Sequence, residues 1–253
     1  MKEENIVVKD LNINYLKTGE GKPFLILHGW GSRKEKWQYV ADILAEKGIN
    51  VIIPDLPGFG KSEQPKIAWS LDNYCDFIVD FVNKIGVDKF YILGHSFGGA
   101  IAAKCDLRFP ERIEKLFLVG AACYRRRLFK TRIFYIVSKA LKIFSFIPGY
   151  FYLKKIFYRF IVKSDYISTK GIMREIYLQL VNKDYPSESI LSQIKDPTII
   201  IWGEKDRITP MKDALLINKK IKGSILEILK KSGHSSYSDY PEELAKIIIK
   251  HID

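Results

Sequence analysis

The residues best suited to covalent chemistry surround Ser96, the centre of the motif Gly94-His95-Ser96-Phe97-Gly98. An apolar run at 90–93 precedes the motif, and a run of small residues at 99–103 follows it. This order predicts a strand, a sharp turn and a helix, an arrangement that presents the serine hydroxyl at the end of the strand. Side chains at the glycine positions would collide with the neighbouring strand and helix. We therefore expect Ser96 to act as a nucleophile.

A serine hydroxyl is a weak nucleophile at neutral pH, so it needs a neighbouring base that is itself held by a third group. Four histidines could supply the base: His28, His95, His234 and His251. We expect His28 to be a structural hydrogen-bonding residue, His95 to point away from the serine beside it, and His251 to be solvated near the C-terminus. His234 lies in the polar loop 232–236 after a predicted strand, where it is free to reach the edge of a sheet. It is the predicted base.

The elements around these residues alternate between strands and helices. Apolar runs predict strands at 24–27, 51–53, 90–93, 113–119, 198–202 and 225–229, after an N-terminal hairpin at 6–16. Helical spacing of apolar residues predicts helices at 37–45, 70–85, 99–109, 211–221 and 241–252, the second with Ser70 as its N-cap. This alternation predicts an α/β fold, with a mostly parallel central sheet and helices on both faces. Ligands of such a sheet bind at the carboxyl ends of its strands.

Five motifs in this order make the chain resemble an α/β-hydrolase of the serine esterase and lipase type, with a helical cap. The motifs are His28-Gly29-Trp30-Gly31, residues 55–62, residues 94–99, Trp202-Gly203-Glu204-Lys205-Asp206 and Ser232-Gly233-His234. The resemblance covers nearly all of the chain outside residues 122–195. It implies an α/β-hydrolase fold and a catalytic triad of Ser96, Asp206 and His234, in the chain order of that family.

The acid of this triad has competitors in the sequence. Asp206 follows the strand that ends at Trp202, where the family places its acid. Glu204 is interpreted as a residue that structures the same loop, and Asp213 as an acid in the first turn of the next helix. Some family members carry the acid after the preceding strand, but residues 120–123 offer no carboxylate.

An oxyanion formed on attack by Ser96 needs hydrogen-bond donors already in place. The backbone N–H of Phe97 is one expected donor, and the backbone N–H of Trp30 is the other by resemblance. The Trp30 side chain is expected to form a wall of the substrate-binding pocket, although it could also be an aromatic residue at the rim of the core.

Residues 122–195 are expected to form an inserted helical cap over a core made of residues 1–121 and 196–253. Apolar residues recur at helical spacing over 133–147 and 153–161, joined by Pro148-Gly149, and a third helix is expected at 172–181. Their apolar faces would cover Ser96, exclude water and line a site for an acyl or aromatic group.

The positive charge of the chain is concentrated in this insertion. The formal net charge is +12, and residues 124–170 contain twelve basic residues against one acid. The first explanation of these charges is a plain solvated surface that binds no ligand. Peripheral contact with anionic lipid or an acidic substrate carrier is a second explanation. Nucleic acid is the least favoured partner because no motif for it is present.

The cysteines and the N-terminal residues lead to expectations about the cellular compartment and the need for a cofactor. Cys75, Cys105 and Cys123 are too far apart for a zinc site and suggest no disulfide framework, so we expect reduced core thiols. The first five residues lack the character of a secretory signal, which predicts a cytoplasmic protein. No metal or other cofactor is expected.

The leading hypothesis is therefore a carboxylic ester hydrolase that works through an acyl-enzyme on small to medium acyl or aromatic esters. Serine at position 96 argues against dehalogenases and epoxide hydrolases, which use aspartate there. Two alternatives remain open. One is a carbon–carbon bond hydrolase of the same fold, and the other is a catalytically silent protein that binds a ligand or membrane through its cap.

Overall fold

The computed structural model describes residues 1–123, 169–180 and 188–252. The strands are β1 (Lys2–Val8), β2 (Leu11–Thr18), β3 (Lys22–Leu27), β4 (Ile49–Pro54), β5 (Phe90–His95), β6 (Ile113–Val119), β7 (Thr198–Gly203) and β8 (Ile225–Leu229). The α-helices are α1 (Gln38–Ala45), α2 (Leu71–Lys84), α3 (Phe97–Arg108), α7 (Gly171–Gln179), α8 (Glu188–Leu191), α9 (Met211–Lys220), α10 (Ser236–Asp239) and α11 (Pro241–Lys250). The described residues also form two 3₁₀ helices, η1 (Lys34–Trp37) and η2 (Pro110–Arg112).

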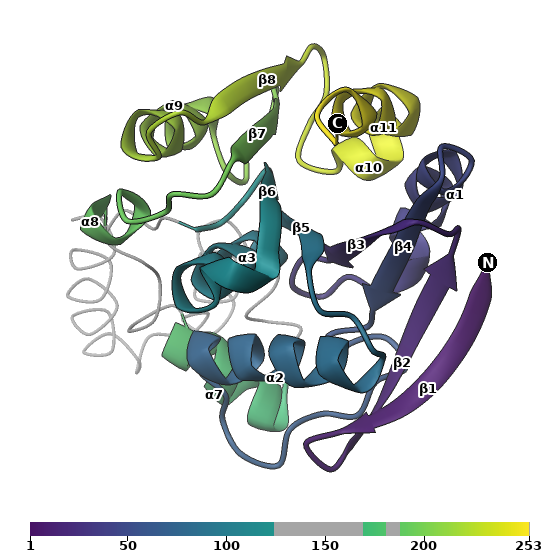
Figure 1. Ribbon diagram of the computed structural model, residues 1–253. Coiled ribbons are helices and arrows are strands. Elements are labelled where there is room, and N and C mark those ends of the chain that lie inside the picture. The colour runs from purple at the N-terminus through teal and green to yellow at the C-terminus, as the bar shows by residue number, and fades with distance from the viewer. Residues whose placement is uncertain (124–168, 181–187, 253) are drawn as a thin grey trace, which may run out of the picture.

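The strands form one sheet in the order β1-β2-β4-β3-β5-β6-β7-β8 (Figure 1). β1 pairs antiparallel with β2 and β2 with β4, and every other neighbouring pair is parallel. The predicted α/β fold with a mostly parallel sheet is thus confirmed. β5, which leads to Ser96, pairs with β3 and β6 and lies near the middle of the sheet.

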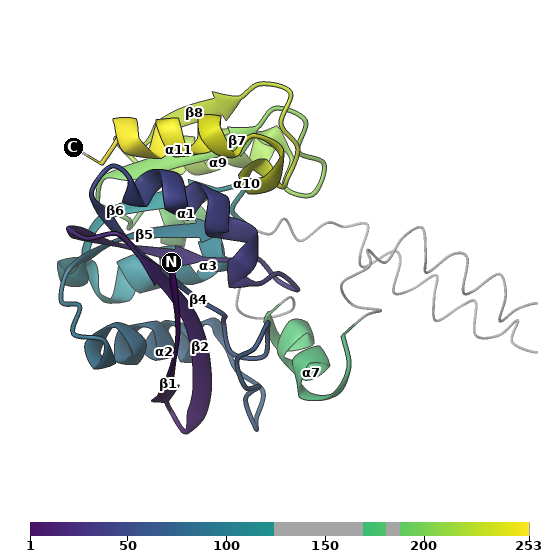
Figure 2. The ribbon, with the colours of Figure 1, turned by 90° about the vertical axis from the view of Figure 1, so that its right-hand side faces the viewer.

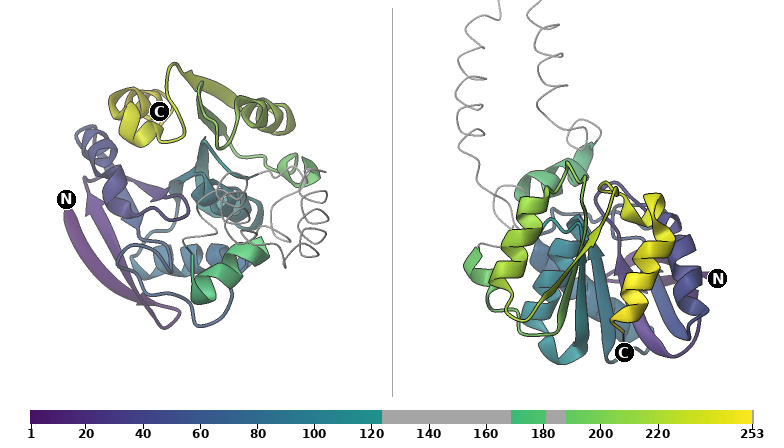
Figure 3. Two further views of the ribbon diagram at one scale, coloured as in Figure 1. Left: turned by 180° about the vertical axis from the view of Figure 1, so that it is seen from behind. Right: turned by 90° about the horizontal axis from the view of Figure 1, so that it is seen from above.

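Helices cover both faces of the sheet because its central strands are apolar on both sides. Leu25 and Leu27 of β3 pack into the core under α2, α3 and α9, whereas Phe24 and Ile26 face the core under α1 and α11. Seen from above, α9 and α11 flank the strands on opposite sides (Figure 3). Continuous burial on both faces explains why these strands appear in the sequence as unbroken apolar runs.

Local signals place the helices close to the predicted positions. Ser70 caps α2, accepting a hydrogen bond from the Asn73 N–H at 3.2 Å, while the Asn73 side chain accepts from the Ser70 N–H at 2.9 Å. The expected helix at 172–181 is present as α7, which stands apart from the helices that cover the sheet (Figure 2). The predicted helices at 133–147 and 153–161 lie outside the described residues, and the cap boundaries 122–195 stay a prediction.

A buried ion pair shapes the loop after β4, which the resemblance singled out as residues 55–62. Lys34 Nζ lies 3.0 Å from Asp55 Oδ2, and both side chains are inaccessible to solvent. Asp55 also accepts hydrogen bonds from the backbone N–H groups of Lys34 at 2.8 Å and Lys61 at 2.9 Å. A Cβ at Gly60 would lie 2.1 Å from the Asp55 carboxylate, so this close turn requires glycine.

Several predictions about single residues are also settled by the fold. All three cysteines are free and buried, as expected. The prediction that His251 is solvated is wrong: its side chain is 12% exposed, and its Nε2 lies 2.8 Å from Glu227 Oε1 on β8. The cause is the packing of the chain end against the last strand, where Glu227 also binds Lys250. Within the described residues, no helix combines the length and the apolar character needed to cross a membrane.

Candidate active site

Ser96 sits between β5 and α3 in a strained backbone conformation. Its φ of 50° and ψ of −114° are rarely adopted by a residue with a side chain. The turn is closed by hydrogen bonds from the Ser96 N–H to the Val119 carbonyl at 3.2 Å, and from the Gly99 N–H to the Ser96 carbonyl at 3.0 Å. Strain of this kind persists only where the surrounding structure fixes the backbone.

The neighbouring glycines are needed for the reason that the motif suggests. A Cβ at Gly94 would lie 2.3 Å from the Gly98 carbonyl oxygen, and one at Gly98 would lie 2.2 Å from the Leu27 carbonyl oxygen on β3. Both contacts are with backbone, which cannot move aside cheaply. The turn therefore brings α3 against two strands at once and presents Ser96 at the carboxyl edge of the sheet.

The structure brings Asp206 and His234 together from different loops. Asp206 follows β7 and His234 follows β8, and His234 Nδ1 donates to Asp206 Oδ2 at 2.7 Å. The His234 side chain is 13% exposed and that of Asp206 is 1% exposed. A buried carboxylate bound to Nδ1 selects the tautomer in which Nε2 is free to accept a proton.

The Asp206 loop is held by hydrogen bonds to its own backbone. Asp206 Oδ1 accepts from the N–H groups of Ile208 at 2.8 Å and Thr209 at 2.9 Å. The Trp202 indole donates to the Thr209 carbonyl at 2.7 Å, which fixes the end of the loop against β7. Burial alone would raise the pKa of Asp206, but hydrogen bonds from His234 and Thr209 outweigh it and hold the pKa below its usual value.

Thr209 is a member of the site to which the sequence assigned no role. Its hydroxyl lies 2.7 Å from Asp206 Oδ2, 3.1 Å from the Gly120 carbonyl and 3.2 Å from His234 Nδ1. The only signal in the sequence is a hydroxyl residue three positions after the acid. That hydroxyl gives Asp206 Oδ2 a second polar neighbour besides the histidine.

The other carboxylates near this loop have the structural roles expected of them. Glu204 accepts from the Lys231 backbone N–H at 3.1 Å, which ties its loop to the loop of the histidine. Asp213 lies in the first turn of α9. The Lys205 N–H donates to the Ser232 carbonyl at 2.8 Å, a further link between the two loops.

His28 is the structural residue that the sequence predicts. Its buried ring donates from Nδ1 to the Gly29 carbonyl at 2.8 Å and accepts at Nε2 from the Leu56 N–H at 3.0 Å. These bonds hold the loop 28–31 to the loop after β4. A Cβ at Gly29 would lie 3.2 Å from Ser96 Cβ, so the peptide that leads into Trp30 passes directly beside the serine.

Trp30 and Phe97 lie together next to this peptide. Their ring centroids are 5.3 Å apart, and the Trp30 ring also contacts Phe59 at 4.9 Å and Tyr177 of α7 at 5.3 Å. Trp30 is half-buried and lines a cavity of about 270 Å³ together with Gly31, Gly58, Phe59, Thr169, Lys170 and Met173. It therefore both packs at the rim of the core and faces a cavity.

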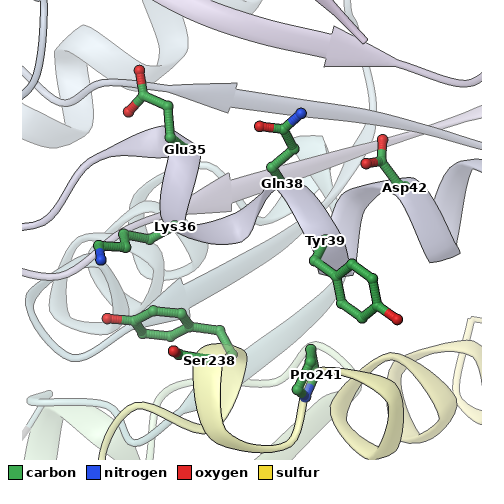
Figure 4. A pocket seen from close by; sticks show the side chains of 8 residues that line it. Glu35, Lys36, Gln38, Tyr39, Asp42, Ser238 and Pro241 are labelled. Carbon is green, nitrogen blue, oxygen red and sulfur yellow. The ribbon is translucent and has the colours of Figure 1, made fainter.

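A larger cavity of about 540 Å³ lies between the η1–α1 segment and the α10–α11 segment (Figure 4). It is lined mainly by polar side chains: Glu35, Lys36, Gln38, Tyr39, Asp42, Tyr237, Ser238 and Pro241. Its lining contains none of Ser96, Asp206 and His234, and it also lacks Trp30, whose loop passes beside the serine and which lines the smaller cavity. Its position therefore does not suit a substrate of the serine.

Gly120 occupies the place after β6 where the sequence offers no acid. Its φ is +48°, and a Cβ there would lie 3.3 Å from Asp206 Oδ2 and 3.4 Å from His234 Nδ1. Gly120→Ala is expected to destabilise the protein by about 1 kcal/mol through backbone strain. It is also expected to lower hydrolytic activity severalfold, because the methyl group crowds the Asp206–His234 hydrogen bond.

Gly86→Ala is the matched control, with a φ of +73° and no atom within 4 Å of its Cβ position. It should cost similar stability in urea unfolding and leave activity unchanged. Equal activity losses in the two variants would contradict the proposed crowding at Gly120.

The sheet order, the strained turn at Ser96 and the loops that bring Asp206 and His234 together are those of one fold. The chain has the fold of the α/β-hydrolases, which confirms the resemblance expected from the sequence. A family model described as alpha/beta hydrolase fold matches residues 22–144.

Three similar proteins are hydrolases of different kinds. The 2-hydroxy-6-oxononadienedioate/2-hydroxy-6-oxononatrienedioate hydrolase 1 of Pseudomonas putida is 27% identical over 264 residues, covering 95% of this chain and 91% of its own. A bacterial membrane phospholipase A has a TM-score of 0.77 at 26% identity, over 98% of this chain and 84% of its own. An esterase of Exiguobacterium antarcticum has a TM-score of 0.76 at 25% identity, over 98% of both chains. Hydrolase activity is thus common to these relatives, whereas the bond that is cleaved differs.

Proposed function

We propose that the protein is a serine hydrolase that cleaves carboxylic esters through an acyl-enzyme. The observation that carries the proposal is the 2.7 Å hydrogen bond between Asp206 and His234, at the sheet edge that presents Ser96 in a strained turn. A binding protein has no need to keep a nucleophile, a base and a buried acid in this arrangement. The esterase and phospholipase relatives support the ester assignment.

The proposed reaction begins when His234 Nε2 accepts the Ser96 hydroxyl proton and Ser96 Oγ attacks the ester carbonyl carbon. Asp206 stabilises the imidazolium that forms. The backbone N–H groups of Phe97 and Trp30 are the proposed donors to the oxyanion, and each such donor typically lowers a barrier by about 3 kcal/mol. His234 then protonates the leaving alcohol. Water that gives its proton to His234 attacks the acyl carbon, which releases the acid and restores Ser96.

A second candidate is hydrolysis of a carbon–carbon bond in a 2-hydroxy-6-oxo-dienoate. The Pseudomonas putida relative, which is named for such a reaction, matches 95% of this chain. Ser96, His234 and Asp206 would have the same roles in this reaction. The leaving group would differ, because it must gain its proton on a carbon atom and not on an alcohol oxygen. Lys170 lines the 270 Å³ cavity beside Trp30 and would place a cation near a substrate carboxylate.

The test compares the two substrate classes with one enzyme preparation. The wild type is assayed with p-nitrophenyl acetate, butyrate, octanoate and palmitate, and with a 2-hydroxy-6-oxo-dienoate whose absorbance is lost on cleavage. Ester turnover with a higher kcat/KM than dienoate turnover supports the proposal, and the preferred chain length measures the acyl site. Dienoate turnover without ester turnover would transfer the assignment to the second candidate.

Lys170→Met gives a further means of separating the candidates. It is expected to raise KM for a dienoate carrying carboxylates about tenfold, because one charge-assisted hydrogen bond of roughly 1.5 kcal/mol is removed. KM for a neutral ester should stay unchanged. Lys212→Met, which removes an exposed lysine from α9, is the control and should alter neither value. An equal rise for both substrates would mean that Lys170 acts through packing alone.

The proposed partners of the protein follow from its chemistry and its charge. A small-molecule ester is the proposed partner, and contact of the basic segment with anionic lipid or an acidic carrier is an additional one. Most of that segment lies outside the described residues. Cytoplasmic residence also stays a prediction.

A further inference from the structure

His95, the residue directly before the serine, makes a contact that the reaction outlined above does not use. Its Nε2 lies 2.9 Å from the backbone carbonyl oxygen of His234, across 139 positions of sequence. The His95 residue is 3% exposed, and the centroids of the two imidazole rings are 4.7 Å apart. The nucleophile's own neighbour is therefore bonded to the main chain of the predicted base.

The direction of this hydrogen bond follows from its partner. A carbonyl oxygen only accepts, so His95 Nε2 must carry the hydrogen. Burial, and next the neighbouring His234, lower the pKa of His95 to about 3, so the ring is neutral and has a single N–H. Within the described residues, the buried Nδ1 has no hydrogen-bond partner. The neutral ring therefore donates its one hydrogen to His234.

Packing holds the His95 ring in this orientation. Trp37 lies against it with a centroid distance of 5.8 Å, and Tyr237 at 5.0 Å. Tyr237 and Trp37 also contact each other at 4.8 Å, and Tyr237 lines the 540 Å³ cavity, whose lining does not include His95. The loop 28–31 is equally close to the ring, because a Cβ at Gly29 would lie 3.0 Å from His95 Nδ1. The ring is thus enclosed between aromatic side chains and the loop 28–31.

The backbone of His95 is as well fixed as its ring. It is the last residue of β5 and is paired with Val119 of β6, near the middle of the sheet. His234 belongs to a loop after the edge strand β8, whose position is set by fewer neighbours. A hydrogen bond from a central strand to this loop therefore restrains the position of the loop, and with it the backbone of the base.

We propose that His95 is a positioning residue that fixes the backbone of His234 relative to Ser96 through its Nε2–H donor to the His234 carbonyl. His95 touches neither substrate nor reacting atoms in this role. The inference rests on the proposed function only in taking Ser96 as nucleophile and His234 as base, and it holds for cleavage of either bond. Misplacement of a base by about 1 Å can cost roughly a hundredfold in rate.

The test uses two variants of nearly equal size, His95→Gln and His95→Met. The glutamine amide can donate from near the position of Nε2, whereas methionine fills similar space without a donor. The first readout is the rate at which a fluorophosphonate probe labels Ser96, which needs no knowledge of the natural substrate. The second is the ring-proton NMR signal of His234 Nδ1–H in its bond to Asp206. Thermal unfolding of both variants measures any general loss of packing.

The expected result is a labelling rate about 10- to 100-fold lower for His95→Met, with a broadened or missing Nδ1–H signal. His95→Gln should label within a fewfold of the wild type and keep the signal. Wild-type labelling and a wild-type signal in His95→Met would overturn the inference, and so would equal losses in both variants at equal stability. A wild type that is not labelled would count against the proposed function, and the NMR comparison would then decide the inference alone.

Discussion

Ser96→Ala is expected to lower kcat/KM by at least about 10⁴-fold, because the covalent route through the acyl-enzyme disappears with the nucleophile. Donors to the oxyanion and the binding site would remain, so a small residual rate above the uncatalysed reaction is expected. The measurement is hydrolysis of the best substrate found in the panel, with circular dichroism to verify folding. Activity that survives the substitution would mean that another group attacks the substrate.

Ser96→Gly separates the chemistry of this position from its backbone strain. Both variants should lose activity to a similar extent, but glycine adopts the φ of 50° without the cost that a side chain imposes there. Relief of strain is partly offset by the greater freedom of glycine in the unfolded chain, which leaves a net gain of about 1 kcal/mol over Ser96→Ala. Urea unfolding of the two variants measures the difference. Equal stabilities would show that the turn stores no strain at Ser96.

Asp206→Asn is expected to lower kcat/KM about 10⁴-fold while leaving KM nearly unchanged. An asparagine amide can donate to Nδ1 and so favour the tautomer whose Nε2 already carries a hydrogen, which prevents it from accepting the Ser96 proton. Glu204→Gln is the matched control, because Glu204 lies in the same loop and binds only the Lys231 N–H among the contacts described above. If activity were lost in Glu204→Gln and kept in Asp206→Asn, Glu204 and not Asp206 would be the acid of the triad.

The pH dependence of stability provides an independent check on Asp206. Its pKa is held below the usual value, so its carboxylate stabilises the fold at every pH above the unfolded pKa of about 3.9. This contribution is lost as the pH falls through the lower, folded pKa. Urea unfolding at intervals from pH 7 to pH 3 should show a constant difference between wild type and Asp206→Asn near neutrality. That difference should shrink below about pH 4, and a difference that is independent of pH would contradict the ionised pair.

The sequence was sufficient for the fold because the signals for it are local. Unbroken apolar runs identify strands buried on both faces, and the Ser70 cap marks the start of α2. The glycines around Ser96 belong to one turn, and their requirement depends on backbone that the motif itself brings together. The same local character made the loops after β7 and β8 recognisable. His234 followed from the polar loop after β8, whereas Asp206 was chosen because the resemblance places the acid after β7.

Contacts between distant segments could not be predicted in this way. His95 was considered only as a base that points away from the serine, and Thr209 was assigned no role, yet both lie against the Asp206–His234 pair. The solvated position predicted for His251 was wrong because Glu227, on another element, binds it. No periodicity or spacing records which side chain a remote loop will meet.

By itself, the sequence determined the mostly parallel sheet, the turn that carries Ser96 and the order of the candidate serine, acid and histidine. Only the tertiary structure decided how the acid and the histidine are held: Asp206 by the backbone of its own loop and the Thr209 hydroxyl, and His234 by a hydrogen bond from β5. The physical reason is that strand and turn formation depends on residues close in the chain. Hydrogen bonds between loops depend instead on how the packed sheet brings the ends of its strands together.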